Sequence, residues 1–558
     1  MQKKYTMGID FGSLSARAVL VDIKNGLVAG EYVSAYAHGV LDSFLPATRE
    51  PLPPASALQL PDDYLAALSE SVKGVLSLTN VPNEDIIGIA VDFTSCTLLA
   101  VDENAEPLCN KEAFRGNIHA YAKMWKQHTA FAEAEEITRV AAERGESFLK
   151  RYGSKILSEW AMPKILETLR KAPDVYAAAY RFIEAGDWIN AKLTGKMTMN
   201  YCMAGLKFLW SPTDGYPDET YFEAVDPALK HVVSEKLVPE SEIYPLDACI
   251  GVISEEGAKL TGLRQGTPVA PARIDAHTAA SAVGANSPGR LLMAIGTGMG
   301  MTLLSKKEIF YDGMCGVSFG AVIPQYYGYE AGLSGCGDIF DWCARTCSNA
   351  ALEKQAADSK VPVIQILTEK AAKLRAGESG LLAVDWWNGN RSVLADTDLS
   401  GMLFGMTLQT QPEEIFRAIL EATGFSARMV VDSFIENGIN VDVIYAVGGI
   451  AQKNILLMQI FADIMNREII VPDVEQACAV GSAIFAAVAA GSVRGGYDTL
   501  DEAIEVMRCT TGIHYHPVPE NVKQYEILFK EFKVLHDYFG RGENTLLKIL
   551  SAMRLSCK

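Results

Sequence analysis

Short polar loops that join apolar stretches are the first candidates for chemistry in this sequence. The stretch "MGIDFGSLSARAVLVD" at residues 7–22 passes from one apolar run through Asp10, Gly12, Ser13 and Arg17 into a second apolar run. Backbone amides and hydroxyls in such a loop can hold a phosphate group, and a carboxylate at its edge can face a metal ion. The same residues also suit an ordinary tight hairpin, because glycine and serine are common in any turn.

Two later loops have a similar composition. Gly296 and Thr297 stand in "AIGTGMG", and Gly448 and Gly449 follow the apolar run "VIYAV", with Asn454 one helical turn further on. Paired glycines let a flat group such as adenosine lie against the backbone, although a simple strand-to-helix turn is an equal alternative. The stretch "GTGMG" lacks the G-x-G-x-x-G spacing of a dinucleotide fold, and the chain contains no G-x-x-x-x-G-K-[ST], which argues against a P-loop.

Single polar and aromatic residues offer weaker signals. Asp275 stands where a helix is expected to begin, so it could act on a ligand or merely cap the helix. His119 and His277 lack partners at metal-ligand spacing and are interpreted as satisfied polar residues. The tryptophans are expected mostly in the core, with one or two able to stack on a sugar ring: Trp125, Trp160, Trp188, Trp386 and Trp387.

The alternation of apolar runs and helical periods predicts an α/β protein. A β-meander is expected over residues 5–36, and a strand over residues 86–102. Helices are expected from about Pro61, at 119–152, at 174–195, after Ser254, from about Asp275, from Pro412 to Asn437 and from about Gln452. The apolar stretch 477–491 is too short to span a bilayer and is predicted to be a buried helix.

The second half of the sequence contains a weak repeat of the first. When Gly12 is set on Gly296, Ser13 falls on Thr297, and a second apolar run follows in both places. A repeat of about half the chain predicts two related domains that face each other, and the space between two domains commonly holds a ligand. The Gly/Pro/Asn/Ser-rich connector at 284–289 places the boundary between a domain 1–285 and a domain 286–558.

Charge and cysteine content exclude several classes of partner. The formal net charge of −18 and the isoelectric point near 5.0 disfavour nucleic acid and an anionic membrane surface. The 11 cysteines form no C-x-x-C pair, as in a protein with reduced thiols. No signal-peptide pattern precedes the first apolar run, so we expect a cytoplasmic protein, for which a homodimer is compatible with the sequence.

The order of these stretches resembles that of the FGGY carbohydrate kinases over residues 5–540. The similar segments include "GIDFGSLSAR", "GIAVDFTSCTLLAVDE", "EAGDWINAKLTG", "IDAHTAASAVGA", "GYEAGLSGCGDIFDW", "GLLAVDWWNGNRS" and "GGIAQKNILLMQIFADI". The resemblance implies two actin-like, ribonuclease-H-type domains with an active-site cleft between them, and ATP with Mg²⁺ as phosphoryl donor. Within the family it is strongest to the members that phosphorylate L-ribulose in arabinose catabolism.

The resemblance also implies roles for individual residues. Asp275 corresponds to the catalytic base, which also contacts the sugar, and Asp10 to the carboxylate near the metal ion. The other correspondences fall into three groups: phosphate loops with Gly12, Ser13, Arg17, Gly296 and Thr297; a nucleotide pocket with Gly448, Gly449 and Asn454; and a sugar pocket with Ser95, Cys96, Lys207 and Glu330.

Three positions depart from the family pattern. Ser13 replaces an expected threonine, "GTGMG" lacks an expected serine, and Ala272-Arg273 replaces an expected Gly-Asn. A cation two residues before the expected base bears on substrate choice more than on the reaction. The alternatives are a kinase of the same family for D-ribulose, ribitol or xylulose, and a non-catalytic actin-like nucleotide-binding protein.

Overall fold

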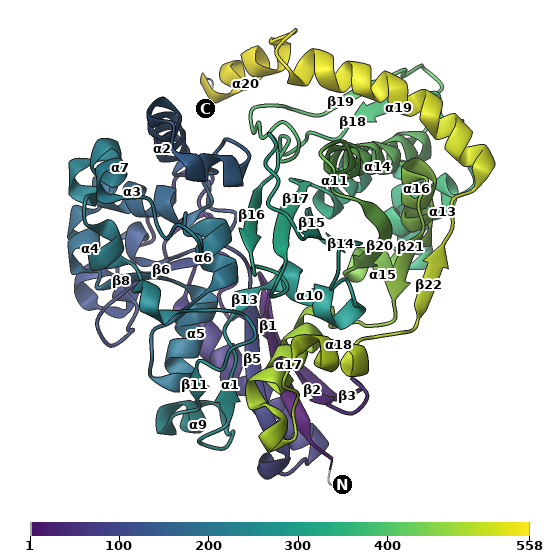
Figure 1. Cartoon of the computed structure of the whole chain (residues 1–558). Helices are drawn as coiled ribbons and strands as arrows, with labels where there is room; N and C mark the ends of the chain where they lie inside the picture. The colour runs from purple at the N-terminus through teal and green to yellow at the C-terminus, as the bar shows by residue number, and fades with distance from the viewer. Residues whose placement is uncertain (1–2, 557–558) are drawn as a thin grey trace.

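Two large mixed β-sheets organise the computed structural model, which describes residues 3–556 (Figure 1). The strands of the first sheet run in the order β11-β12-β5-β1-β2-β3, with β13 also paired to β5, and those of the second in the order β16-β17-β15-β14-β20-β21-β22. The first sheet consists of β1 (Tyr5–Phe11), β2 (Ser15–Asp22), β3 (Val28–Ala35), β5 (Ile86–Phe93), β11 (Gly251–Val252), β12 (Pro268–Val269) and β13 (Arg273–Ile274). The second consists of β14 (Gly289–Ile295), β15 (Met299–Ser305), β16 (Gly316–Phe319), β17 (Tyr327–Leu333), β20 (Val441–Val447), β21 (Ile469–Pro472) and β22 (Gly512–Tyr515). The predicted α/β class and the predicted meander are confirmed.

The two sheets share one topology. β1 is antiparallel to β2 and parallel to β5, and β14 is antiparallel to β15 and parallel to β20. Further out, β12 is parallel to β5 and antiparallel to β11, as β21 is parallel to β20 and antiparallel to β22. The weak sequence repeat therefore corresponds to a duplicated sheet, the arrangement expected of two actin-like domains.

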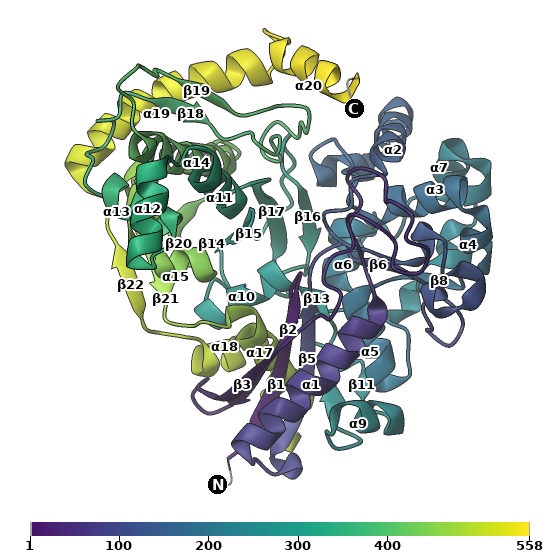
Figure 2. The same ribbon diagram turned by 180° about the vertical axis from the view of Figure 1, so that it is seen from behind.

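A long helix follows the antiparallel strands in each half. α1 (Pro61–Thr79) begins with proline and carries two aspartates in its first turn, which favour the start of a helix. It ends at Asn80, whose left-handed conformation is typical of a helix C-terminus. Figure 2 shows α1 lying across β1, β2 and β3. α14 (Pro412–Glu436) also begins with proline and has a capping box between Gln411 and Glu414. The prediction of both helices is confirmed.

One helix from the C-terminal half of the chain packs on the first sheet. α17 (Ala477–Ala490) lies beside β1 and β5 (Figure 1). Its small side chains allow close contact, since a Cβ atom added to Gly8 would lie 1.8 Å from the Ala479 carbonyl oxygen. Thr6 Oγ1 donates a hydrogen bond to the Ala483 carbonyl oxygen at 2.8 Å. The prediction of a buried helix here is confirmed, and this helix ties the two halves of the chain together.

The expected helix over residues 119–152 is wrong for about half of its length. α2 (Phe131–Arg144) is an α-helix, and a 3₁₀ segment spans Ser147–Tyr152. Before them, β7 (Ala122–Lys123) pairs with β6 (Leu98–Val101) in a separate four-stranded sheet of order β4-β7-β6-β8, in which β4 spans Leu58–Gln59 and β8 spans Arg181–Glu184. Pairing with a distant strand, which local periodicity does not report, decides the conformation there.

The same four-stranded sheet interrupts two further predictions. Residues 174–195 were expected to be one helix, but a strand separates two helices: α4 (Pro173–Ala178), β8 (Arg181–Glu184) and α5 (Ala185–Thr194). The expected strand over 86–102 is likewise two strands, β5 and β6, which belong to different sheets. The turn between β5 and β6 contains Cys96 at φ 59°, in the left-handed region, and this turn redirects the chain.

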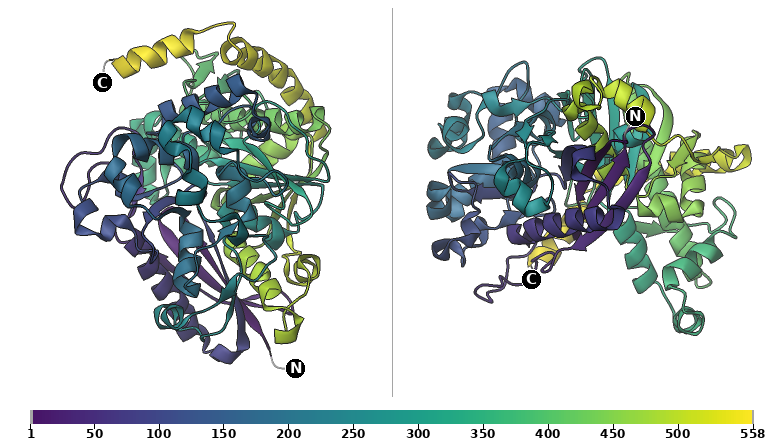
Figure 3. Two further views of the ribbon diagram at one scale, coloured as in Figure 1. Left: turned by 60° about the vertical axis from the view of Figure 1, so that its left-hand side comes forward. Right: turned by 90° about the horizontal axis from the view of Figure 1, so that it is seen from below.

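The C-terminal helices lie on the outside of the molecule. α19 (Pro519–Gly540) and α20 (Leu546–Ser556) run along one edge, and the two chain termini lie at opposite ends (Figure 3). Within residues 3–556, no helix is long and apolar enough to cross a membrane. The ten cysteines of this part of the chain are free.

Candidate active site

Two aspartates lie side by side near the ends of β1 and β5. These strands are parallel, and Asp10 is the register partner of Asp92. Asp10 Oδ2 accepts a hydrogen bond from Arg17 Nη1 at 2.9 Å, and Asp92 Oδ2 accepts one from Ser482 Oγ at 2.6 Å. Asp92 is fully buried, and within the described chain its Oδ1 has no hydrogen-bond partner. Burial and the nearby Asp10 raise the pKa of Asp92 well above its usual value.

The chemistry of this aspartate pair fits a Mg²⁺ ion. The ion prefers oxygen ligands, and Asp92 Oδ1, which has no hydrogen-bond partner among the described residues, is free to act as one. Donor atoms of Asp10, Asp92 and Cys478 lie within 4.8 Å of one another, but a thiol is not a ligand that Mg²⁺ favours. Sequence reasoning singled out Asp10 and missed Asp92, whose signal was a lone carboxylate within the apolar run that begins at Ile86.

The first predicted phosphate loop is a tight hairpin turn. The Gly12 amide donates to the Ser15 carbonyl oxygen at 3.0 Å, and Tyr36 donates its hydroxyl to the Gly12 carbonyl oxygen at 2.9 Å. Trp125, which sequence reasoning considered for sugar stacking, donates its Nε1–H to Ser13 Oγ at 3.0 Å. The Ser13 hydroxyl thus accepts from the indole and keeps its own proton for another acceptor.

The second and third predicted loops meet at the end of β14. Gly448 has φ 101°, and a Cβ atom there would lie 2.4 Å from the Ile295 carbonyl oxygen, so only glycine fits the turn. By contrast, a Cβ atom added to Gly296 or to Gly449 meets nothing within 4 Å. Gly296 and Thr297 are exposed. The backbone at these loops is therefore open to a ligand.

Asn454, predicted to lie in a nucleotide pocket, has a structural role in this fold. α15 (Gly449–Lys453) begins at Gly449, a few residues earlier than predicted, and α16 (Ile455–Met465) follows it directly. Asn454 caps α16, since its Oδ1 accepts the Leu457 amide at 3.0 Å. Its amide group NH₂ is the part that a nucleotide could engage.

Asp275 opens α10 (Asp275–Val283), but it is not the N-cap residue, which is Ile274. Its Oδ1 accepts the amide of the following Ala276 at 2.7 Å. Burial, with the negative charge of Asp10 next in importance, raises the pKa of Asp275 to about 7. The carboxyl of Asp275 can therefore change protonation near neutral pH, as a catalytic base must.

A buried ion-pair group joins the two halves of the chain. Lys207, the last residue of α6 (Tyr201–Lys207), has its Nζ 2.5 Å from Glu330 Oε2 in β17. Arg391, in the loop between β18 (Leu382–Val384) and β19 (Met402–Phe404), has its Nη2 3.0 Å from Glu330 Oε1. Burial alone would raise the pKa of Glu330, but the two cations outweigh it and lower that pKa to about 2.

The structure brings this ion-pair group near the start of α10. A Cβ atom added to Gly300 of β15 would lie 3.7 Å from the Cβ of Ala276, and Glu330 is the register partner of Thr302, two residues further along β15. Lys207 and Glu330 were expected in a sugar pocket, whereas Arg391 was missed. Its signal was the arginine in "WNGNRS", a segment used for the resemblance without a role for that residue.

The predicted segment at Ser95 and Cys96 borders the same group. Ser95 Oγ lies 3.4 Å from Cys96 Sγ, and Lys164 Nζ donates to the Cys96 carbonyl oxygen at 2.5 Å. Burial raises the pKa of Cys96 to about 12, although the positive charge of Lys207 partly opposes this rise. Lys207 Nζ also lies 5.4 Å from the ring centre of Trp160, so Trp160 packs beneath the ion pair.

Arg273, the bulky departure from the family pattern, is directed into the protein interior. Its guanidinium lies 3.8 Å from the ring centre of Phe485 in α17 and donates to the Pro271 carbonyl oxygen at 2.7 Å. Burial lowers its pKa to about 9, with the charge of Asp92 opposing that effect. Arg273 therefore packs α17 against the first sheet.

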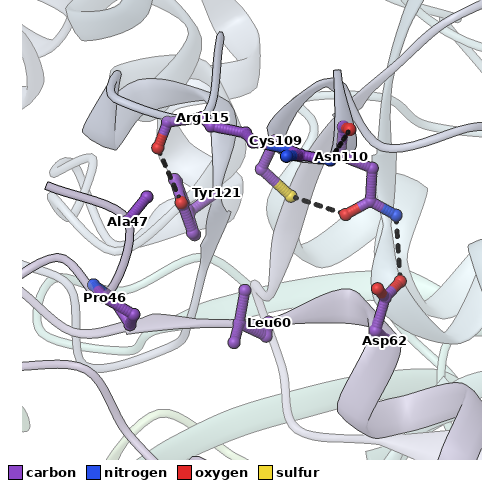
Figure 4. Close-up of a pocket in the computed structure, with 8 residues that line it drawn as sticks. All are labelled: Pro46, Ala47, Leu60, Asp62, Cys109, Asn110, Arg115 and Tyr121. Carbon is purple, nitrogen blue, oxygen red and sulfur yellow. Dashed lines mark hydrogen bonds between the residues drawn. The ribbon is translucent and has the colours of Figure 1, made fainter. Parts of the chain in front are cut away.

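A surface hollow of about 450 Å³ lies in the N-terminal half. Figure 4 shows the residues that line it, with hydrogen bonds from Asn110 to Asp62 and from Tyr121 to the Arg115 carbonyl oxygen. None of the residues predicted for the site lines this hollow. The candidate site is accordingly defined by the residue contacts above.

The chain belongs to the FGGY family of carbohydrate kinases, whose N-terminal domain matches residues 5–284 and whose C-terminal domain matches residues 291–490. It is 49% identical over 550 residues to the ribulokinase of Geobacillus thermodenitrificans, covering 99% of this chain and 97% of that one. It is also 49% identical over 554 residues to the ribulokinase of Halalkalibacterium halodurans, covering 99% and 98%. The chain is therefore an ATP-dependent sugar kinase, which decides against the non-catalytic alternative.

Solved structures show the same fold. The gluconate kinase of Lactobacillus acidophilus superposes with a TM-score of 0.77 at 19% identity, over 97% of this chain and 99% of that one. The xylulose kinase of Rhodospirillum rubrum superposes with a TM-score of 0.72 at 22% identity, over 96% and 98%. The predicted two-domain actin-like fold is confirmed.

Proposed function

We propose that this kinase phosphorylates L-ribulose to L-ribulose 5-phosphate in arabinose catabolism. The observation that carries the proposal is the ion-pair group of Lys207, Glu330 and Arg391. Glu330 lies in β17, whose neighbour β15 packs beside Ala276 at the start of α10, where Asp275 stands. The near full-length similarity to proteins named ribulokinase supports this choice of sugar. D-ribulose, ribitol and xylulose are the competing substrates within the family.

In this proposal the sugar is held by fixed charges. The ionised Glu330 accepts hydrogen bonds from hydroxyls, while Lys207 donates to hydroxyl or carbonyl oxygens of an open-chain ketose. Arg391 holds the second oxygen of Glu330, so the carboxylate keeps one orientation when the sugar enters. Ser95 and Cys96 border this pocket.

Asp275 would accept the proton of the attacking hydroxyl. Phosphoryl transfer depends mainly on in-line positioning and on neutralisation of phosphate charge, with the carboxylate helping late. A pKa of about 7 for Asp275 leaves about half of the carboxyls ionised at neutral pH. The reaction should therefore speed up as pH rises through this range.

The nucleotide would be held by the three loops. Gly448 and Gly449 leave room for adenosine, with the Asn454 amide at its edge. The phosphates would be bound by the hydroxyls of Ser13 and Thr297 and the guanidinium of Arg17, while Gly12 and Gly296 form the tight turns that let the phosphates approach the backbone. Asp10 and Asp92 would hold Mg²⁺, which supplies charge neutralisation on the phosphate oxygens.

A sugar panel tests the proposal. ADP release would be measured with L-ribulose, D-ribulose, ribitol and D- and L-xylulose, and without sugar. We expect the highest kcat/KM with L-ribulose. A higher kcat/KM with any other sugar would transfer the assignment to that sugar.

Two further expectations belong to the same proposal. We place the domain boundary near residue 285 and the enzyme in the cytoplasm, where ATP is available to it. Limited proteolysis tests the boundary, since cleavage should concentrate in the connector at 284–289. The two fragments should stay associated, because α17 packs on the first sheet.

A further inference from the structure

Two histidines and a glutamate meet on the exposed face of the outermost strand of the second sheet. β22 pairs with β21, and His514 is the register partner of Ile470. Because side chains alternate along a strand, His514 and His516 share a face with Glu468, which directly precedes β21. Tyr515, between the histidines, is buried, whereas the side chains of His514 and His516 are 51% and 70% exposed.

The three donor atoms stand near the separations of a coordinated ion. His514 Nδ1 lies 2.8 Å and His516 Nδ1 3.7 Å from Glu468 Oε1. All three donor atoms lie within 4.8 Å of one another. Ligand atoms of a tetrahedral zinc ion lie roughly 3.3 Å apart, given bonds of about 2.0–2.1 Å. The observed distances to the carboxylate oxygen bracket this value, so small side-chain rotations suffice.

The backbone that carries these ligands is already fixed. Gln459 Nε2 of α16 donates to the His516 carbonyl oxygen at 2.9 Å. Two residues later, the Val518 amide donates to Asp463 Oδ1, also of α16, at 2.8 Å. His514 is held by the ladder to β21. Binding an ion therefore orders side chains alone, which lowers the entropic cost.

We infer that Glu468, His514 and His516 bind a zinc ion or a similar divalent transition-metal ion. Two imidazole nitrogens and one carboxylate oxygen form a donor set typical of zinc, whereas Mg²⁺ favours oxygen ligands. The site uses none of the active-site residues. A bound ion links β22 to Glu468, the residue before β21. It therefore holds the edge strand on the second sheet and stabilises the folded protein.

Zinc titration of the full chain tests the inference. Chelator-treated protein would be titrated with ZnCl₂ by calorimetry in excess Mg²⁺, which occupies oxygen-ligand sites. The double variant His514→Ala/His516→Ala is compared with the parent. The matched control is His231→Ala, because the exposed pair of His231 Nδ1 and Glu219 Oε1 at 2.8 Å is not part of a three-ligand group in residues 3–556. Exposed thiols such as Cys249 can also bind zinc, but they are the same in every variant, so their contribution cancels in the comparison.

We expect the double variant to bind one zinc ion fewer than the parent, and His231→Ala to bind as many as the parent. Zinc should also raise the melting temperature of the parent and of His231→Ala more than that of the double variant, even if the double variant is itself less stable. An unchanged number of bound zinc ions in the double variant would overturn the inference. An equal zinc-dependent rise in melting temperature for all three proteins would also overturn it.

Discussion

Replacing Asp275 with asparagine tests the proposed base with little change in shape. Asparagine keeps a side-chain oxygen that can accept the Ala276 amide, as Asp275 Oδ1 does at 2.7 Å, but it cannot take up the proton. General-base catalysis contributes on the order of 10²- to 10⁴-fold, which corresponds to about 3–5 kcal/mol of activation free energy. We expect kcat with the best pentulose to fall by such a factor, with ATP affinity nearly unchanged.

The raised pKa of Asp275 adds a prediction about stability. Burial moves it from 3.8 to about 7, so the unfolded chain ionises first and the native state loses stability as pH rises between these values. At about 1.4 kcal/mol per pKa unit the loss is at most about 4 kcal/mol, and partial exposure to solvent reduces it. Asp275→Asn lacks this loss. Its unfolding free energy relative to the parent should therefore increase from pH 4 towards pH 7 and stay level above.

The assay combines ADP release with denaturant unfolding at several pH values. The parent kcat/KM for the sugar should rise as pH passes through about 7, because this ratio reports the pKa of the free enzyme, and Asp275→Asn should show a low value without that rise. Asp218→Asn is the matched control, because Asp218 caps α7 (Glu219–Val225) by accepting the Tyr221 amide at 3.0 Å. A folded Asp275→Asn that turns over at nearly the parent rate would refute the role of Asp275 as base.

The other predictions concern the two ligands and the domains. A Cβ atom added to Gly449 meets nothing within 4 Å, so Gly449→Val should fold; it should raise the KM for ATP while sugar affinity persists, and equal loss of both would contradict the nucleotide assignment. Glu330→Gln should raise the KM for the sugar and not for ATP, and an unchanged sugar KM would remove Glu330 from the pocket. Arg391→Met removes a partly buried ion pair while Lys207 still pairs with Glu330, so it should lower the free energy of unfolding by about 1.5–3 kcal/mol and raise the sugar KM. An Arg391→Met protein with parent stability and sugar KM would show that the Arg391 contact is dispensable. Sugar and ATP analogue together should reduce the radius of gyration in X-ray scattering, and an unchanged radius would contradict domain closure.

Local sequence patterns were sufficient to predict the turns and helix starts, because short-range interactions control them. A glycine-containing turn joins β1 to β2, and another joins β14 to β15. Matching Gly12 with Gly296 therefore predicted the duplicated sheet. α1 and α14 begin at prolines with acidic first turns, which marks helix starts in any context. The turns at Gly12, Gly296 and Gly448 were recognisable because glycine and polar residues stand at the ends of apolar strands.

What sequence reasoning missed depends on contacts between distant segments. β8 has a helical period and becomes a strand because β6 pairs with it. Asp92 gains its meaning only from the register with Asp10. Arg391 reaches Glu330 from a loop 61 residues away, and no spacing rule connects the two. Arg273 was predicted to bear on substrate choice, but α17 covers it in the fold, with Phe485 against its guanidinium.

The position of α17 has a consequence for how the protein is made. Thr6 and its hydrogen-bond partner Ala483 are 477 residues apart, and the ribosome synthesises the chain from the N-terminus. The apolar residues of β2 and β5 that pack on α17, such as Val19 and Ala90, therefore have no cover while most of the chain is translated. During this period the nascent sheet presents the kind of surface that chaperones bind, and its cotranslational folding ends only when α17 emerges.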